Sequence, residues 1–201
     1  MATHFFGQCL TTCPKFEVHF TGADQLTGGS GADVLIGGLG ADTLSGGGGA
    51  DNFRFVNEIS GSGADGSLGG TRGDTVTDFN WGTDRNGQAN ATQADRLDMR
   101  ELFDEAFTGR SVDDAAKLAD GYLDIRNVLR RVNGQDVTDW QIWVDRDGKD
   151  SRGASAYGLL ATVQNVSPLG SGSETGITGT ETTSELLRKM LEEGRLVVAG
   201  G

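Results

Sequence analysis

The sequence has little proline, cysteine and histidine, with two of each among its 201 residues. So few cysteines exclude a fold that depends on disulfide bonds. The histidines form no His-Glu-x-x-His motif, and the sequence also lacks the Gly-x-Ser-x-Gly motif of serine hydrolases. We therefore expect no enzymatic activity.

Long apolar runs and basic residues are scarce as well. No segment approaches the roughly 18 apolar residues of a membrane span, and residues 1–10 lack the basic start and apolar run of a cleavable signal peptide. Seventeen basic residues face 29 acidic ones, which gives a net charge of −12. This charge argues against nucleic acids and anionic membranes as partners, because both require a basic surface. Cations are the natural counterpart.

Glycine, in contrast, is abundant: the 33 glycines are about one residue in six, against a usual share of roughly 7%. Many of them follow a period of nine. Residues 28–36, 37–45 and 46–54 each begin with Gly-Gly, carry Asp at the sixth position and place an apolar residue at the eighth. A partial copy precedes them at 21–27, and worn copies follow at 60–68 and 69–77. A flexible glycine-serine linker would not keep this spacing.

The nonapeptide predicts a coil in which tight turns alternate with short strands. Glycine permits the positive-φ backbone of such turns, and the apolar residues Leu26, Leu35, Leu44 and Phe53 would begin strands and point inward. Because two nonapeptides make one coil, the aspartates should fall alternately on two sides. We expect Asp24 and Asp42 on one side, and Asp33 and Asp51 on the other.

Stacked turns of this kind supply the oxygen ligands that a calcium ion needs. Calcium takes six to eight oxygens, whereas magnesium demands a stricter octahedron and keeps its waters. The candidate ligands are carboxylates at Asp24, Asp33, Asp42 and Asp51 and backbone carbonyls at Gly28, Ser30, Ala32, Gly37, Leu39, Ala41, Gly46, Gly48 and Ala50. Further candidates are Asp65 and Asp74 in the worn copies, and Asp145 and Asp147.

Two smaller clusters leave alternatives open. Residues 145–150 resemble a calcium loop but lack the third acidic residue and the distal glutamate of an EF-hand, so a polar turn between strands is the alternative. In the first twenty residues, Cys9 and Cys13 with His4 and His19 could bind zinc. Their spacing fits no zinc finger or ribbon, and ordinary thiols are the alternative.

These repeats resemble the RTX (repeats-in-toxin) family, whose nonapeptide binds calcium. The segments 74–79 and 94–103 further resemble the sequence that follows the repeats in type I secretion target domains, as at the end of large RTX adhesins. The resemblance implies a mainly β fold: a short parallel β-roll of nonapeptide repeats stacked on a β-rich C-terminal domain with a few short helices. Expected boundaries are 1–20 for an atypical segment, 21–56 for the roll, 57–78 for degenerate repeats and a loop, and 79–201 for the secretion domain.

Local patterns refine this outline. Helical spacing predicts helices over 98–107, 112–120 and 183–193, the last with an apolar stripe and a stop at Gly194. Strands are expected within 140–145 and 157–166, and residues 195–198 form a strand or an extended tail.

The resemblance also implies a function. The chain would be a module that folds on extracellular calcium, and residues 183–198 would carry an uncleaved signal that the type I secretion transporter reads. It would be the tail of a larger secreted or cell-surface bacterial protein. The alternative is a calcium-dependent adhesion module that itself binds a glycan or another cell-surface ligand.

Overall fold

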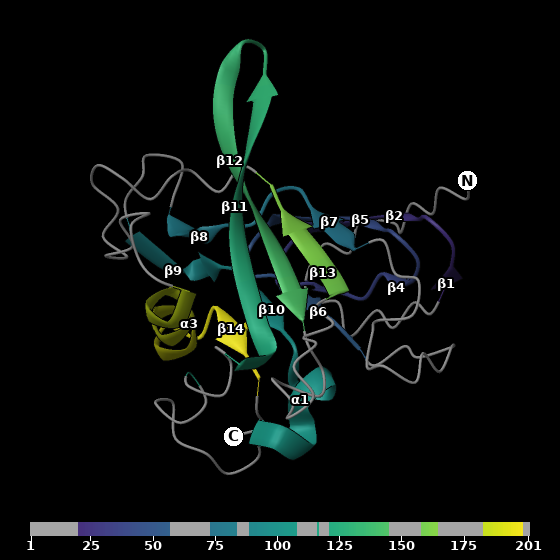
Figure 1. The fold of residues 1–201 in the computed structure, drawn as a ribbon. Coiled ribbons are helices and arrows are strands. Elements are labelled where there is room, and N and C mark those ends of the chain that lie inside the picture. Colours follow the sequence, from purple (N-terminus) through teal and green to yellow (C-terminus); the bar gives the residue numbers. More distant parts are fainter. Residues whose placement is uncertain are drawn as a thin grey trace.

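The computed structural model describes residues 20–56, 73–83, 89–107, 116, 121–144, 158–164 and 183–198. The predicted segment 1–20, the loop at 57–72 and most of the predicted helix 112–120 lie outside this part of the chain. The described residues form a mainly β fold with short helices, as predicted (Figure 1). Within them, no helix is long and apolar enough to cross a membrane.

The larger sheet has six strands in the order β11-β12-β13-β7-β5-β2. Its parallel half contains the strands that follow alternate repeat turns, together with β13. Its antiparallel half joins β11, β12 and β13. The bounds are β2 (Gln25–Ser30), β5 (Thr43–Gly48), β7 (Asp74–Val76), β11 (Leu123–Val132), β12 (Gln135–Val144) and β13 (Gly158–Val163).

The second sheet has four parallel strands in the order β14-β10-β6-β3. They are β3 (Val34–Leu35), β6 (Asn52–Arg54), β10 (Arg96–Asp98) and β14 (Leu196–Val197). Two smaller pairs complete the strands: parallel β1 (Phe20–Thr21) with β4 (Gly38–Leu39), and antiparallel β8 (Trp81–Thr83) with β9 (Ala89–Ala94).

Each sheet contributes one ladder of apolar side chains to a shared core. In the six-stranded sheet, the register aligns Leu26, Leu44, Val76 and Val163. In the four-stranded sheet, it aligns Leu35, Phe53, Leu97 and Leu196. All eight side chains are buried in one cluster, which confirms the inward orientation predicted for the repeat residues. Strands β13 and β14 therefore continue the roll as further rungs.

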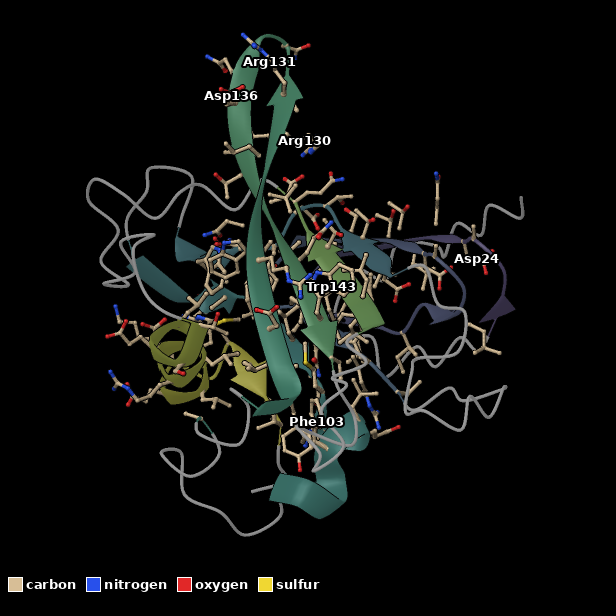
Figure 2. All side chains as sticks on the ribbon, viewed as in Figure 1. Asp24, Phe103, Arg130, Arg131, Asp136 and Trp143 are labelled. Carbon is tan, nitrogen blue, oxygen red and sulfur yellow. The ribbon has the colours of Figure 1, made fainter. Side chains whose placement is uncertain are left out.

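A long hairpin of β11 and β12 projects from the body of the fold (Figures 1 and 2). It turns at Asn133 and Gly134, both of which have positive φ, as favoured hairpin turns require. The base of the hairpin packs on the core through Ile125 and Ile142. Toward its tip, Leu129 is 74% exposed.

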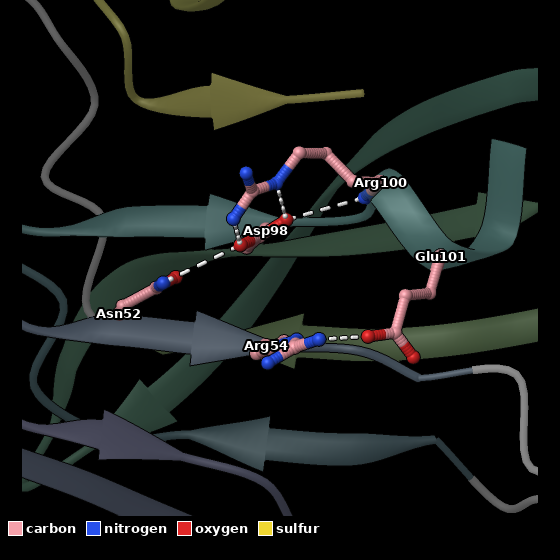
Figure 3. A network of polar contacts seen from close by, with 5 residues as sticks. All are labelled: Asn52, Arg54, Asp98, Arg100 and Glu101. Carbon is pink, nitrogen blue, oxygen red and sulfur yellow. Dashed lines mark hydrogen bonds and ion pairs between the residues drawn. The ribbon is translucent and has the colours of Figure 1, made fainter. Parts of the chain in front are cut away.

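Polar contacts join the repeat strand β6 to the segment that follows β10 (Figure 3). The buried carboxylate of Asp98 accepts hydrogen bonds from Arg100 Nη2 at 2.6 Å and from Asn52 Nδ2 at 3.4 Å. Arg54 forms an ion pair with Glu101. Burial alone would raise the pKa of Asp98, but the hydrogen bonds from Arg100 hold it below the ordinary value. The roll is thus joined to β10 and to the residues that follow it by charged contacts as well as by the apolar core.

The predicted helices agree with the structure where it describes them. Helix α1 (Arg100–Phe107) lies within the predicted 98–107, and α3 (Thr183–Glu192) matches 183–193. Leu187 and Met190 of α3 are completely buried, and Gly194 ends the helix with φ of 67°. The predicted strands appear in β12, β13 and β14.

Candidate metal centre

The repeat aspartates form two ladders, and their carboxylates connect successive turns. On the first side, the backbone N–H of Asp24 donates to Oδ1 of Asp42 at 2.8 Å, and the N–H of Asp42 donates to Oδ1 of Asp74 at 3.0 Å. The first bond joins residues two repeats apart, and the second joins residues 32 positions apart. They confirm the predicted pairing of Asp24 with Asp42, and they place Asp74 of the worn copy on the same ladder.

The second side repeats this arrangement. The N–H of Asp33 donates to Oδ1 of Asp51 at 2.9 Å, as the alternation predicted, and the N–H of Asp51 donates to Oδ1 of Asp95 at 2.8 Å. After each aspartate a strand begins, because the next backbone N–H pairs with an aspartate carbonyl of the neighbouring turn, as between Asn52 and Asp33 at 2.8 Å. The carboxylates are thereby fixed at the junctions of turns and strands.

In three of these aspartates, one carboxylate oxygen is buried without a hydrogen-bond donor among the described residues. Oδ2 of Asp24, Asp33 and Asp51 has no partner among the described residues, and Asp51 is only 1% exposed. A buried carboxylate oxygen without a partner is costly. Because the same unpartnered oxygen recurs from turn to turn, it is a candidate ligand for a cation.

Oδ2 of Asp33 and of Asp42 lies close to the first glycine of its own turn. A Cβ placed on Gly28 would lie 2.7 Å from Oδ2 of Asp33 and 2.7 Å from the carbonyl oxygen of Gly46. A Cβ on Gly37 would lie 2.7 Å from Oδ2 of Asp42 and 3.1 Å from Oδ2 of Asp74. Oxygens of two stacked turns therefore converge at the first glycine of a turn, where a side chain would fill the hollow.

Glycine at the fourth position of the repeat allows the turns to stack. Gly40 and Gly49 have φ of 148° and 133°, a region that other residues rarely adopt. A Cβ on either would overlap the carbonyl of the turn below, at Gly22 and Gly31 respectively. This requirement accounts for glycine at the fourth position of these two repeats.

The carbonyl candidates fall into two groups. Those of Leu39 and Gly48 accept the N–H of Gly22 and Gly31 from the neighbouring turn, at 2.7 and 2.6 Å, and so help to hold the stack. The carbonyl of Gly46 lies at the hollow beside Gly28. The remaining carbonyl candidates belong to the same turns: Gly28, Ser30, Ala32, Gly37, Ala41 and Ala50.

Carboxylates crowd together on the second side. Burial raises the pKa of Asp51 to about 6, the charges of Asp33 and Asp78 add to the rise, and the N–H of Asp33 opposes it. Burial likewise raises the pKa of Asp95 to about 7 against two backbone hydrogen bonds, with Asp51 and Asp78 adding to the effect. Negative charge is thus disfavoured here unless a cation offsets it.

The oxygen ligands of these turns fit calcium better than a metal that is bound by side chains alone. Nowhere in the described part of the chain do three or more His, Cys, Asp or Glu side chains gather around one point. The turns instead offer one carboxylate oxygen each together with backbone carbonyls, which are the hard ligands that calcium accepts in flexible geometry. Predicted candidates Asp65, Asp145 and Asp147, and the Cys9 and Cys13 cluster, lie outside the described residues.

Two carboxylates that contact these turns were not among the residues predicted from the sequence. Asp95 precedes Leu97 with the same Asp-x-apolar spacing as the repeats, and Ala94 precedes it as in five of the six repeat copies, so a local signal was present. Asp78 has no counterpart in the nonapeptide, yet its carboxylate accepts the N–H of Gly46 and of Gly47. No repeat pattern would have found it.

Comparison with known proteins agrees with this geometry. Residues 20–53 match the model of the RTX calcium-binding nonapeptide repeat, in four copies. The chain carries RTX calcium-binding repeats. The match spans both aspartate ladders as far as Asp51, while Asp74 and Asp95 lie beyond it.

Other comparisons add little. One solved structure with detectable similarity is a subunit of a mannuronan C5-epimerase from Azotobacter vinelandii, determined in solution. It is 29% identical, with 73% of this chain and 68% of that chain covered, and the TM-score is 0.35. A TM-score this low does not establish a shared fold. No curated protein sequence matches the chain significantly.

Proposed function

We propose that this chain is a calcium-binding module that folds when calcium fills its stacked turns, and that residues 183–198 carry a type I secretion signal. The observation that supports calcium-driven folding is the recurring, buried and unpartnered Oδ2 of Asp24, Asp33 and Asp51. A fold that buries such oxygens is incomplete without a cation.

In this mechanism, the ions would lie between stacked turns of the same side. The Oδ2 atoms and the turn carbonyls would hold them. Oδ1 of Asp42, Asp51, Asp74 and Asp95 accepts the N–H of the preceding aspartate on the same side and keeps the turns in register. A bound calcium ion supplies the positive charge that offsets the crowded carboxylates. Without it, the carboxylates repel one another and the glycines favour the unfolded ensemble, so binding energy becomes folding energy.

Secretion follows from the difference in calcium between compartments. Extracellular calcium modules have dissociation constants of about 10⁻⁴–10⁻³ M, so such a chain would remain unfolded in a calcium-poor cytosol and fold outside. The position of residues 183–198 supports this order of events. Leu187 and Leu196 are buried in the folded chain, so a transporter would have access to this segment only before folding.

Calcium titration of the whole chain tests the folding claim. Circular dichroism should show a transition to β structure as calcium is added, reversed by chelator. The paired substitutions Asp33→Asn and Asp42→Asn, one on each side, should move the transition to higher calcium. A spectrum that stays the same under chelation would refute calcium-driven folding.

The secretion signal is tested separately with a passenger. Residues 120–201 fused to a passenger should be exported by cells that express a type I transporter, and removal of 183–198 from the fusion should abolish export. Export that persists without 183–198 would contradict this assignment and leave the calcium claim intact.

A second candidate is a calcium-dependent binding module, favoured by the outer face of the six-stranded sheet. The strand register aligns one row of polar side chains across it: Gln25, Thr43, Thr75, Thr162, Gln141 and Arg126. A row of hydroxyls and amides suits a hydroxyl-rich glycan. Glycan binding that is lost with chelator, and with Thr43→Val and Thr75→Val, would support this function.

A further inference from the structure

The repeat turn at residues 46–51 is held by a carboxylate from outside the repeats. Oδ1 of Asp78 accepts the backbone N–H of Gly46 at 2.9 Å. Its Oδ2 accepts the N–H of Gly47 at 2.9 Å and the hydroxyl of Ser45 at 2.7 Å. One carboxylate thus binds three consecutive residues at the start of this turn.

Within the stack, a turn is held by its neighbour at the fourth and sixth positions of the repeat. The turn at 28–33 donates the N–H of Gly31 to the carbonyl of Gly48 and the N–H of Asp33 to the carboxylate of Asp51. For the turn at 46–51, Asp95 accepts the N–H of Asp51 through Oδ1 and that of Asn80 through Oδ2, at 2.8 and 2.7 Å. Asp78 and Asp95 therefore take the place of a further repeat.

Topology separates Asp78 from the space between the stacked turns. Strand β5 pairs with β2 on one edge and with β7 on the other, and Asp78 follows β7. It therefore approaches the turn at 46–51 from the edge opposite the turn at 28–33. Both of its oxygens are already engaged by that turn, so it is placed to shape the turn and not to bind an ion between the two turns.

We propose that Asp78 is a positioning residue, which holds the turn at 46–51 in its calcium-binding conformation where no further repeat follows. The inference rests on the proposed function, because it assumes that these turns bind calcium. Asp78 lies beyond the repeats, and its proposed role concerns the second side alone. The first side, built on Asp24, Asp42 and Asp74, makes no contact of this kind with Asp78 among the described hydrogen bonds.

Asp78 could also act simply through its charge, and two variants separate the possibilities. Asp78→Asn removes both the charge and one acceptor. Ser45→Ala removes a hydroxyl donor to the same carboxylate without changing any charge. Asp136→Asn is the matched control, because Asp136 is a 65% exposed carboxylate near the hairpin tip and its loss changes the net charge equally.

The experiment is a calcium titration of the full chain followed by amide NMR. The N–H signals of Gly31 and Gly47 report the second side, and those of Gly22 and Gly40 report the first. We expect Asp78→Asn to weaken calcium binding on the second side by on the order of tenfold, the scale of a charge-assisted hydrogen bond. Ser45→Ala should weaken it by about threefold, and Asp136→Asn should leave both sides unchanged.

Several results would overturn the proposal. Equal weakening on both sides would show a general loss of stability, and an unchanged second side would show no role. An effect of Asp78→Asn that disappears at 1 M salt, with Ser45→Ala silent, would show that charge alone acts. If Asp78→Asn does not fold, Ser45→Ala still decides. A wild-type chain without any calcium response would refute the proposed function itself, and would be seen before any variant is compared.

Discussion

Gly28 and Gly48 belong to equivalent kinds of turn but differ in what surrounds them. A Cβ on Gly28 would meet Oδ2 of Asp33 and the carbonyl of Gly46, whereas a Cβ on Gly48 meets nothing within 4 Å. Neither has a positive φ, so Cβ contact alone distinguishes them. We expect Gly28→Ala to weaken calcium binding by at least tenfold, about 1.4 kcal/mol, and Gly48→Ala to leave it nearly unchanged.

Isothermal titration calorimetry of the two variants and the wild type measures this difference. Equal effects of both substitutions would mean that the hollow at Gly28 holds no ion and that glycine serves only the backbone. Loss of binding in Gly28→Ala alone, with one side of the roll still occupied, would assign the hollow to the second side.

The raised pKa values of Asp51 and Asp95 predict a pH dependence of calcium binding. Their pKa values in the metal-free fold are about 6 and about 7, against an ordinary value of 3.8. Between about pH 4 and 7 the folded state therefore binds more protons than the unfolded state, and the stability of the metal-free fold falls as the pH rises. Calcium requires the deprotonated carboxylate, so binding must release protons in this range.

For calcium binding to the metal-free fold, the midpoint should therefore rise as the pH is lowered from 7.5 to 5.5, whereas the unfolded chain, whose aspartates are already deprotonated in this range, contributes no such rise. Protonation of Asp51 alone gives roughly a fourfold increase. The carboxylates that face it are Asp33 and Asp78, whose charges raise its pKa, and Asp95, which accepts its N–H. Proton release can be measured by calorimetry in buffers of different ionisation enthalpy. A midpoint that stays constant across this range would contradict the prediction, and Asp51→Asn should flatten the dependence.

At the level of single residues, the period of nine predicted four aspartates and their two sides correctly. The period did not extend to Asp95, which joins the second ladder 44 residues beyond Asp51, because a linear period loses its phase across an insertion and only the local Ala-Asp-x-apolar spacing remains. In the folded chain, hydrogen bonds between β6 and β10 align Asp95 with Asp51 despite the insertion. Asp78 was harder still to predict, because a carboxylate that substitutes for a missing turn has no counterpart in the repeat sequence.

Among the elements, helix α3 was the most predictable. Its apolar stripe and glycine stop are both local, and both appear in the structure. The hairpin of β11 and β12 went unrecognised, although Asn133-Gly134 is a strong local turn signal. The pairing of β13 with β7, and of β14 with β10, joins segments about 85 and 100 residues apart, and no local signal encodes it.

Helix α3 offers a test of how firmly its segment is packed. Leu187 is completely buried, while its neighbour Leu191 is only partly buried against the core. Leu187→Ala should lower the free energy of unfolding of the calcium-loaded chain by about 2–5 kcal/mol, through lost burial and a residual cavity. Leu191→Ala is the matched control and should cost clearly less. Chemical denaturation in saturating calcium measures both, and equal losses would contradict the packing described.

For the whole molecule, the two apolar ladders imply that calcium and the segment 183–198 are coupled. The ladder of the four-stranded sheet runs from Leu35 in the first full repeat to Leu196 in β14. Backbone bonds continue it, since the N–H of Leu97 donates to the carbonyl of Arg195 at 2.7 Å. Strand β10 thus links the second aspartate ladder, through Asp95, to β14. Calcium that orders the ladder should also order β14.

Hydrogen exchange of the full chain, with and without calcium, measures this coupling. Calcium should slow exchange in 183–198 as strongly as in the repeats, while the hairpin tip near Leu129 should change least. Because coupling between two sites is reciprocal, Leu196→Ala should also weaken calcium binding, although it lies far from any proposed ligand in sequence. A segment 183–198 that exchanges independently of calcium would show that β14 docks on an already formed roll. In that case, calcium could not hide this segment from a transporter.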